Sequence, residues 1–526
     1  MPKKIILRLH DGSSREIPAP EDQTLAQAVF LAGLWPDLPL CSGLGRCGLC
    51  RARYLSGVPL PLPAELRKLT REEVREGWRL ACLHPAGSAE VELPRPRSVP
   101  PIRRTLAAEA AGYLALAVDL GTTSLHWSAL AGEAPVASGQ ELNPQIGLGG
   151  EVMSRLAFAA LKPGNREILR DLVLDRLRGL AASLPAPVGS LGLAGNPAMI
   201  LLALGLNTAG LAQAPYRLDY AAGEVLRLGH GLPEAYIPPL LSPFVGADLA
   251  SGLAALRFGG REPLDYPFLL ADMGTNGEFV LALSETERLC ASVPLGPTLE
   301  GVGLCFGRTA GPGAVVSFAL TPGGILPEYL PEQPDAAPDP AARPGITGTG
   351  YLSLAALLLR NGLLDEDGRF TAPATPLGAR LAGRLGGVRN EPAFLLDDGL
   401  FLPASDVEEI LKVKAAFNLA FTSLLEAAGI GPGRLAAVFL AGALGEHAGL
   451  DDLERLGFLP PGLKARTRKA GNTSLAGLTV LLAPATRDAA REFAAGLRAG
   501  TRLVDLTGEE SFGRRYLERM RFVHVS

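Results

Sequence analysis

The sequence lacks both a dominant charge and a long apolar run. Among its 526 residues, 50 Lys and Arg stand against 54 Asp and Glu, for a net charge of −4. Without a dense basic run, nothing indicates binding to nucleic acid. No uncharged apolar run reaches the ~18 residues of a membrane-spanning helix, and the N-terminus has no apolar signal-peptide core. We therefore expect a soluble, cytoplasmic protein with no nucleic-acid or membrane partner.

Cysteine and histidine are scarce, with six residues of each. So few cysteines in so long a chain do not form a disulfide framework, which favours a reducing compartment. The histidines show no H-x3-H spacing, so no separate histidine metal site is predicted. Cys290 and Cys305 stand alone in apolar surroundings, and we interpret them as small buried side chains.

Two common nucleotide-binding motifs are missing. No G-x-x-x-x-G-K-S/T sequence occurs, which excludes a P-loop ATPase. No G-x-G-x-x-G follows a strand with an acidic residue ~20 positions on, which disfavours a Rossmann site. A nucleotide site in this chain must therefore be built from other elements.

The remaining four cysteines form a pattern typical of an iron–sulfur site. Cys41, Cys47 and Cys50 follow the spacing C-x5-C-x2-C, and Cys82 comes 31 residues later. Four thiolates satisfy one 2Fe–2S cluster, and the plant-type pattern C-x4-C-x2-C differs by one residue in its first gap. The alternatives are a zinc site or unrelated buried cysteines, but zinc usually shows two C-x2-C pairs. We interpret the four cysteines as ligands of a 2Fe–2S cluster.

Residues 1–95 carry the element order of a ferredoxin-like β-grasp. Apolar spacing predicts a helix over 22–34 with Thr24 as a candidate N-cap, and a second, charged helix over 66–78. Strands are expected over 4–9, 14–17, 51–54 and 89–93. Four prolines between positions 94 and 101 then mark a linker, which we place at 96–112.

The rest of the chain contains an internal repeat. Residues 117–127 match residues 270–280: each is an apolar strand with an Asp near its end, a Gly-Thr turn and a second strand. Asp119 and Asp272 can hold Mg²⁺ directly or through water, and the turns behind them expose N–H groups to phosphate oxygens. One such motif could be a plain hairpin turn, but two could hold one nucleotide from both sides.

A third element, residues 437–446, is an apolar strand that opens into a glycine turn. Backbone without side chains can lie close to a flat ligand such as adenosine. The candidate nucleotide-binding residues are Asp119, Gly121, Thr122, Thr123, Ser124, Asp272, Gly274, Thr275, Asn276, Gly277, Gly442, Ala443 and Gly445.

These three elements resemble those of the ATPase superfamily that contains acetate and sugar kinases, heat-shock chaperones and actin. The resemblance implies two related RNase H-like α/β lobes that close on Mg²⁺ and ATP in the cleft between them. We place the first lobe, a middle domain, at 113–205 and the second at 206–526. The expected fold class is a multidomain α+β and α/β protein.

Together with the N-terminal cysteine domain, the chain resembles the reductive activators of corrinoid-dependent enzymes. Further stretches that fit are residues 143–145, 194–199, 244–248, 296–301, 345–350 and 471–474. Thr349 and Ala443 depart from the serine and glycine expected there. The resemblance implies ATP-dependent transfer of one electron from the cluster to a corrinoid protein of a methyltransferase system, returning Co(II) to Co(I). It also implies a low-potential electron donor and a homodimer.

Three carboxylates are candidates for catalysis. Asp248 could contact Mg²⁺ or the attacking water, or cap a helix. Glu278 could orient water or pair with a neighbouring charge, and Glu300 could face the cleft. Two other functions stay open: a small-molecule kinase with a regulatory ferredoxin domain, and a plain iron–sulfur electron carrier.

Overall fold

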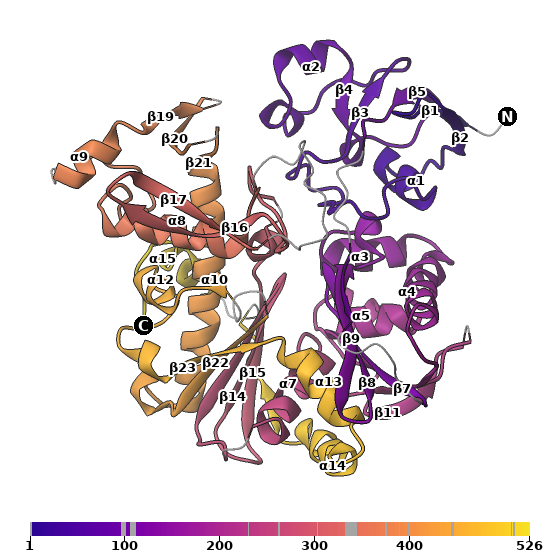
Figure 1. The fold of residues 1–526 in the computed structure, drawn as a ribbon, viewed down its shortest axis with the longest axis vertical. Helices are drawn as coiled ribbons and strands as arrows, with labels where there is room; N and C mark the ends of the chain where they lie inside the picture. The colour runs from indigo at the N-terminus through magenta and orange to yellow at the C-terminus, as the bar shows by residue number, and fades with distance from the viewer. Residues whose placement is uncertain are drawn as a thin grey trace.

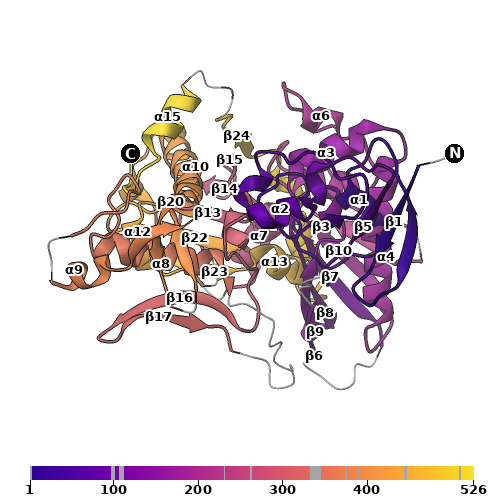
Figure 2. The same ribbon diagram turned by 90° about the horizontal axis from the view of Figure 1, so that it is seen from above.

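The protein is built from an N-terminal domain and two lobes, each on its own sheet (Figure 1). The computed structural model describes residues 3–95, 101–105, 112–229, 231–260, 263–301, 303–331, 345–373, 376–388, 390–397, 399–442, 447–506, 508 and 511–526. Seen from above, the N-terminal domain lies over the middle lobe, and its α2 side reaches toward the C-terminal lobe (Figure 2).

The N-terminal domain is a five-stranded sheet in the order β2-β1-β5-β3-β4. Its elements are β1 (Lys4–Arg8), β2 (Ser14–Pro18), α1 (Leu25–Leu31), β3 (Arg51–Tyr54), α2 (Arg71–Arg75), β4 (Trp78–Leu80) and β5 (Ala89–Glu92). As predicted, Thr24 caps the first helix, accepting the Gln27 N–H at 3.2 Å. Buried Ile5, Leu7, Val91 and their neighbours form the core on one face of the sheet.

The helix predicted over 66–78 is wrong in its extent. The chain instead forms a short 3₁₀ turn (Glu65–Arg67), then α2, then the strand β4. Gly77 takes φ +90°, and a Cβ there would lie 2.6 Å from the Tyr54 carbonyl oxygen. Because only glycine fits that turn, the helix stops and Trp78–Leu80 pairs with β3.

The middle lobe holds a seven-stranded sheet in the order β11-β12-β10-β7-β8-β9-β6. Its strands are β6 (Ile102–Thr105), β7 (Leu114–Leu120), β8 (Ser124–Ala131), β9 (Ala134–Leu142), β10 (Val188–Ala194), β11 (Glu224–Arg227) and β12 (Glu234–Ile237). Its helices are α3 (Val152–Leu161), α4 (Asn165–Ala182), α5 (Pro197–Ala203) and α6 (Ala209–Ala212). The boundary drawn after residue 205 falls inside this sheet, because β12 pairs with β10. The strand β6 likewise pairs with β9 from within the segment 96–112.

The C-terminal lobe is built on a six-stranded sheet in the order β23-β22-β13-β14-β15-β24. These strands are β13 (Phe268–Met273), β14 (Asn276–Ala282), β15 (Arg288–Pro294), β22 (Ala437–Gly442), β23 (Thr467–Gly471) and β24 (Thr501–Leu503). Two small sheets flank it: β16 (Ala314–Thr321), β17 (Gly324–Tyr329) and β18 (Gly345–Ile346), and β19 (Leu385–Val388), β20 (Glu391–Leu395) and β21 (Phe401–Pro403). Helices α8 (Gly348–Arg360), α9 (Pro376–Ala382), α10 (Ala404–Ala428), α12 (Leu450–Arg455), α14 (Arg487–Leu497) and α15 (Phe512–Glu518) complete the lobe.

The two lobes repeat one strand arrangement. The order β9-β8-β7-β10-β12 in the middle lobe corresponds to β15-β14-β13-β22-β23 in the C-terminal lobe. In both, the first three strands are antiparallel hairpins and the last two run parallel to the third. The internal repeat seen in the sequence is therefore a structural repeat, and the predicted pair of related α/β lobes is confirmed.

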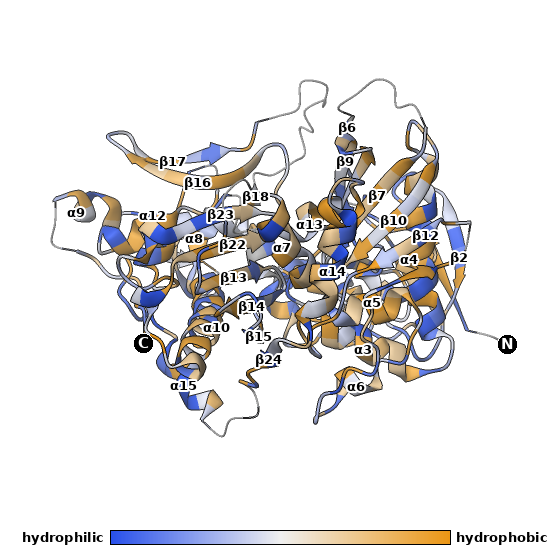
Figure 3. Ribbon diagram, turned by 90° about the horizontal axis from the view of Figure 1, so that it is seen from below, coloured by the Kyte–Doolittle hydropathy of each residue, from blue (hydrophilic) through white to orange (hydrophobic). Residues whose placement is uncertain are grey.

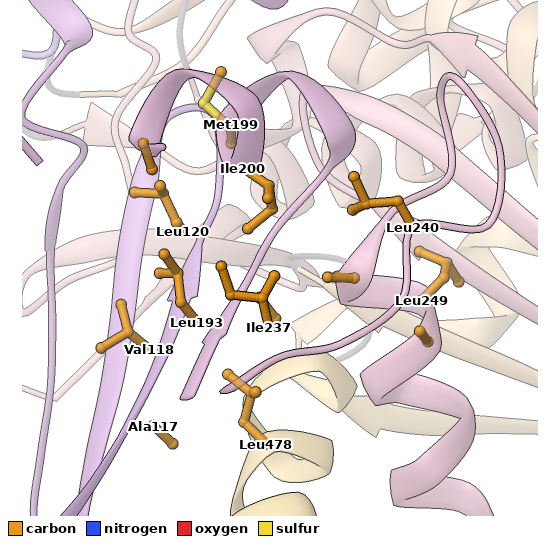
Figure 4. Packing of buried hydrophobic residues seen from close by; sticks show 14 of the residues in the cluster. Ala117, Val118, Leu120, Leu193, Met199, Ile200, Ile237, Leu240, Leu249 and Leu478 are labelled. Atoms are coloured by element: carbon orange, nitrogen blue, oxygen red, sulfur yellow. The ribbon is translucent and has the colours of Figure 1, made fainter. Parts of the chain in front are cut away.

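Two crossing helices, α7 (Ala247–Phe258) and α13 (Thr473–Leu482), pack between the sheets (Figure 1). Their backbones approach closely at Gly477, where a Cβ would lie 1.8 Å from the Ser251 carbonyl oxygen. Leu249 of α7 and Leu478 of α13 join the buried apolar cluster of the middle lobe (Figure 4). The central strands β7 and β13 are almost wholly apolar (Figure 3). Within the described ranges, no helix combines the length and apolarity that crossing a bilayer would require.

Candidate functional site

The first Gly-Thr turn, which we call the phosphate-1 turn (Gly121–Ser124), joins β7 to β8. Asp119, just before it, accepts the Asn472 side-chain N–H at 2.7 Å and the Ser474 hydroxyl at 2.8 Å. Both donors come from the stretch 471–474 at the start of α13. The Asp119 carboxylate is thus satisfied by amide and hydroxyl donors that lie more than 350 residues away in the chain.

Three other polar side chains hold the phosphate-1 turn. Asn143 donates to the Gly121 carbonyl at 2.7 Å, and Asn196 donates to the Thr122 hydroxyl at 3.1 Å. Arg155, fully buried on α3, donates to the Thr122 carbonyl. Sequence reasoning gave none of these residues a role. Asn143 and Asn196 lay in stretches that fit the family, whereas a lone arginine in a helix gives no signal.

The second Gly-Thr turn, the phosphate-2 turn (Gly274–Gly277), joins β13 to β14. Thr275 donates its hydroxyl hydrogen to Glu300 Oε1 at 2.7 Å, so Glu300 lies beside this turn. A Cβ on Gly442, which takes φ +75°, would lie 2.5 Å from Asp272 Oδ1. Only glycine therefore fits beside this carboxylate at the end of β22. Ala443 and Gly445, the other candidates in that element, lie outside the described residues.

The two turns meet each other. The hydroxyl oxygens of Thr123 and Thr275 lie 3.0 Å apart, within hydrogen-bond distance, although 152 residues separate them. Ser124 and Asn276 begin the strands that follow the two turns, and the Gly274 N–H donates to the Asn276 carbonyl at 3.1 Å. The structure thus brings the two predicted phosphate-binding turns to one place.

Five carboxyl groups gather at this junction, and we call them the carboxylate cluster: Asp119, Asp248, Asp272, Glu278 and Glu300. Burial raises the pKa of Asp272 well above its ordinary value, and the neighbouring carboxylates, Asp248 first, raise it further. Burial, with the Asp119 charge adding to it, raises the pKa of Asp248 to about 7. Burial and the charges of its neighbours also raise the pKa of Glu278. A cation would relieve this crowding of negative charge.

The candidate catalytic carboxylates differ in their hydrogen bonds. Asp248 lies in the first turn of α7, whose N-cap is Gly246, and it accepts the Leu249 N–H at 2.8 Å. Glu278 Oε1 and Glu300 Oε2 are buried without a hydrogen-bond partner among the described residues. Buried polar atoms are nearly always partnered, so these two oxygens indicate places where a water or a bound cation belongs.

The four cysteines of the predicted cluster site lie together in the N-terminal domain. Cys41, Cys50 and Cys82 are buried and Cys47 is half-buried. The Cys47 N–H points to Cys41 Sγ and the Leu49 N–H to Cys47 Sγ, both at 3.5 Å. Hydrogen bonds among the thiols lower the pKa of Cys41 and raise those of Cys47 and Cys82. Amides that face sulfurs in a turning loop suit an iron–sulfur ligand set.

The other two cysteines lie elsewhere. Cys290 is fully buried in β15, as predicted, whereas Cys305 is only half-buried, because it lies in the loop after the Glu300 turn and its N–H donates to Asp406 at 2.9 Å. Among the described residues, no three or more His, Cys, Asp or Glu side chains are spaced as a finished metal site. The assignment of the cluster ligands therefore rests on the cysteine spacing and on the contacts among the thiols.

The fold and the site define a ferredoxin-type domain joined to a two-lobed core of the acetate and sugar kinase, heat-shock chaperone and actin class. Residues 9–87 match the 2Fe–2S iron–sulfur cluster binding domain, residues 114–260 the RACo middle region and residues 267–526 the C-terminal ASKHA domain of RACo. These matches follow one another along nearly the whole chain. The chain therefore belongs to the RACo family.

Individual relatives agree with this assignment. The chain is 26% identical over 393 residues to the corrinoid activation enzyme RamQ of Eubacterium limosum, covering 70% of this chain and 64% of that protein. It is 26% identical over 362 residues to the Co(II) methylated amine-specific corrinoid protein reductase of Methanosarcina barkeri, covering 62% of each. The chain thus spans just under two thirds of both relatives. A solved reductive activator for corrinoid, iron–sulfur protein shares the fold, with a TM-score of 0.67, 19% identity and coverage of 100% of this chain and 99% of that chain.

Proposed function

We propose that this protein is an ATP-dependent reductive activator that passes one electron from a 2Fe–2S cluster to a corrinoid protein, returning Co(II) to Co(I). The observation that carries the proposal is the meeting of the two phosphate turns at Thr123 and Thr275 in a chain that begins with a cluster-binding domain. The names of the two curated relatives, a corrinoid activation enzyme and a Co(II) corrinoid protein reductase, support the choice of acceptor.

The cleft residues divide into those that bind and those that act on water. The backbone N–H groups of the phosphate-1 and phosphate-2 turns bind phosphate oxygens. Asp272 faces the Mg²⁺ that accompanies the nucleotide, because it is buried beside the charges of Asp248, Asp119 and Glu300, which a cation would offset. Asp248 and Glu278, whose pKa values burial raises, are suited to accept a proton from the attacking water. Gly442, at the end of β22, is the proposed contact to adenosine, whereas Ala443 and Gly445, proposed for the same role, lie outside the described residues.

The N-terminal domain would bind the cluster that carries the electron. Cys41, Cys47, Cys50 and Cys82 are the proposed cluster ligands, and the cluster supplies one-electron chemistry when bound. A cluster held by these cysteines and reduced by a low-potential donor would supply the one electron that converts Co(II) to Co(I). The nucleotide can favour this uphill step only if it binds one arrangement of the lobes better than another. A homodimer remains part of the proposal.

The decisive experiment is an ATPase assay with and without a corrinoid protein in the Co(II) state. We expect hydrolysis to be coupled to reduction, so that the Co(II) partner raises the rate. A small-molecule kinase would instead need a sugar or carboxylate acceptor and would ignore the corrinoid protein. A plain electron carrier would hydrolyse nothing under either condition, and either result would contradict the proposal.

The cluster assignment has its own test. Analysis should find about two irons per chain, as one 2Fe–2S cluster implies. Cys82→Ala should lose the visible absorption of the cluster because packing cannot replace a missing ligand, whereas Cys290→Ala, a matched change at a buried cysteine in β15, should keep it. Bound zinc in place of iron, or bleaching by Cys290→Ala, would overturn the assignment.

A further inference from the structure

Arg155 is a fully buried cation whose hydrogen bonds all go to uncharged groups. Its Nε donates to the Gly149 carbonyl at 2.9 Å and its Nη1 to Gln145 Oε1 at 3.3 Å. Its Nη2 donates to the Thr122 carbonyl, and Nη1 also contacts Met199 Sδ at 2.9 Å. Burial lowers the pKa of this guanidinium to about 9, and the Glu300 charge offsets part of that shift. Because burying a charge without an ion pair is costly, this position needs a reason.

Arg155 connects two segments of the middle lobe by hydrogen bonds. On one side is the carbonyl of the peptide that links Thr122 to Thr123 in the phosphate-1 turn. A donor on that oxygen polarises the same peptide's N–H, which lies on the opposite side, toward an incoming phosphate oxygen. On the other side is the segment Gln145–Gly150, which we call the seat.

The seat packs against the N-terminal domain. Phe30 of α1 is buried in the middle-lobe core, and a Cβ on Gly147 would lie 2.1 Å from its ring. A Cβ on Gly150 would lie 2.7 Å from the carbonyl oxygen of Cys41, a proposed cluster ligand. The next residue, Ser42, donates its hydroxyl hydrogen to the Ile146 carbonyl at 2.5 Å. The cysteine loop therefore rests directly on backbone that Arg155 holds.

The cysteine loop also makes an exposed ion pair with the C-terminal lobe. Arg46 lies 3.5 Å from Glu409 of α10, and the Arg46 side chain is 51% exposed. Exposed ion pairs of this kind contribute little. The buried contacts with the seat should therefore dominate, so that the cysteine loop follows the middle lobe.

We propose that Arg155 is a positioning residue that transmits occupancy of the phosphate-1 turn to the cysteine loop through the seat. The inference rests on the proposed function, since it requires a bound cluster and a bound nucleotide. Its test needs no corrinoid protein, so the two can fail separately. Arg155→Lys is the informative change, because lysine keeps the charge but cannot donate to Thr122, Gly149 and Gln145 at once.

The experiment records the EPR spectrum of the reduced cluster, and the affinity for Mg–ADP, in the full-length protein with and without that nucleotide. We expect Mg–ADP to change the wild-type spectrum. Arg155→Lys should keep the cluster and bind Mg–ADP within about threefold of the wild type, but lose most of the spectral response. Arg176→Lys is the matched control, because Arg176 is a middle-lobe arginine whose Nη1 donates to Glu141 at 2.7 Å, away from the seat.

Ser42→Gly tests the other end of the route. Ser42 takes φ +40°, which glycine tolerates, so the change removes the hydroxyl without straining the loop. It should weaken the response while leaving Mg–ADP affinity unchanged. If both variants respond as the wild type does, or if the wild type binds Mg–ADP with an unchanged spectrum, the inference is overturned and the proposed function stands. If the wild type binds no nucleotide at all, the proposed function falls with it.

Discussion

The two phosphate turns share a topology but not an environment. Asp119 and Asp272 each stand one residue before the end of the third strand of their sheet order, β7 or β13. Asp119 accepts hydrogen bonds from Asn472 and Ser474, whereas Asp272 has a pKa that is raised by burial and, to a lesser degree, by neighbouring carboxylates. One repeated motif therefore lies in two environments: the first aspartate accepts hydrogen bonds from the start of α13, and the second is buried among carboxylates, where we propose that it faces a cation.

The register explains the difference. His126 of β8 is the partner of Asp119, whereas Glu278 of β14 is the partner of Asp272. This one change places a second carboxylate beside the phosphate-2 turn. Asp248 and Glu300 then add to the negative charge on the same side. This asymmetry is consistent with the proposal that Mg²⁺ binds beside the phosphate-2 turn.

Asp272→Asn should have the largest effect on ATP hydrolysis. The amide keeps the shape but removes the charge that faces the cation, and metal-assisted phosphoryl transfer depends on that charge. We expect ATP hydrolysis to fall by roughly 100-fold or more, a size typical of losing one preorganised electrostatic contact. A coupled ATPase assay measures this, with the exposed Glu287→Gln as the control in the same lobe. The visible spectrum of the cluster should not change. Equal rates in the two variants would show that Asp272 does not face the cation.

Asp119→Asn should have a smaller effect, chiefly on stability. Hydrogen bonds to a charged acceptor contribute about 1.5–3 kcal/mol, and this change weakens those from Asn472 and Ser474. Denaturant unfolding should show a loss of that order, with ATP hydrolysis reduced by about tenfold because α13 is no longer fixed. Ser474→Ala should show about half the loss in stability. A loss of ATPase as large as that of Asp272→Asn would contradict the division of roles.

The carboxylate cluster also predicts a pH dependence of folding. Burial raises the pKa of Asp248 from 3.8 to about 7, so between those values the folded state binds more protons than the unfolded state. Stability of the protein without Mg²⁺ and nucleotide should therefore fall as pH rises from about 4 to about 7. Asp272 and Glu278, whose pKa values are also raised, should add to the same trend.

Denaturant unfolding at pH 5 and pH 7.5 measures this trend, and Asp248→Asn should flatten it. Mg–ADP should restore stability at the higher pH by neutralising the cluster. If the wild type and Asp248→Asn show the same pH dependence, Asp248 does not titrate in this range. The negative charge beside the phosphate-2 turn would then be smaller than we propose.

Thr123→Val should have the smallest effect. It removes the hydrogen bond to Thr275 that joins the two turns while keeping the shape of the side chain. A bond between neutral groups contributes about 0.5–1.5 kcal/mol, so we expect Mg–ADP affinity to fall by roughly two- to tenfold. Isothermal titration measures it, with Thr286→Val, at the exposed end of the β14–β15 hairpin, as the control. An unchanged affinity would mean that the turns bind phosphate independently.

Motifs with local chemistry could be predicted from the sequence. Three of the four cluster cysteines and each of the two Asp-x-Gly-Thr turns can be recognised within about ten residues of sequence. The adjacent glycines allow the backbone conformation that these motifs need. The repeat of the strand order followed from the repeat of the turns. The prediction of a helix over 66–78 was wrong because Trp78–Leu80 pairs with β3 as a strand, a tertiary contact that the local sequence does not show.

Contacts between distant residues could not be predicted. Asn472 and Ser474 meet Asp119 only because α13 crosses between the lobes. Arg155 joins the phosphate-1 turn to the seat from the middle of a helix whose spacing is ordinary. The stretch 471–474 fitted the family pattern, but no local pattern showed that it contacts Asp119, and none marked Arg155, because these contacts depend on the assembled fold.

The proposed function requires that nucleotide bound between the two phosphate turns drives reduction of a corrinoid protein by the cluster. The most direct measurement follows the Co(I) absorption band of a Co(II) corrinoid protein over time under a mild reductant, with and without ATP. We predict that Co(I) forms with the wild type only when ATP is present, and that neither Asp272→Asn nor Cys82→Ala forms it. If the wild type shows no ATP dependence with several corrinoid proteins, or if Asp272→Asn reduces cobalt as fast as the wild type, the account is contradicted.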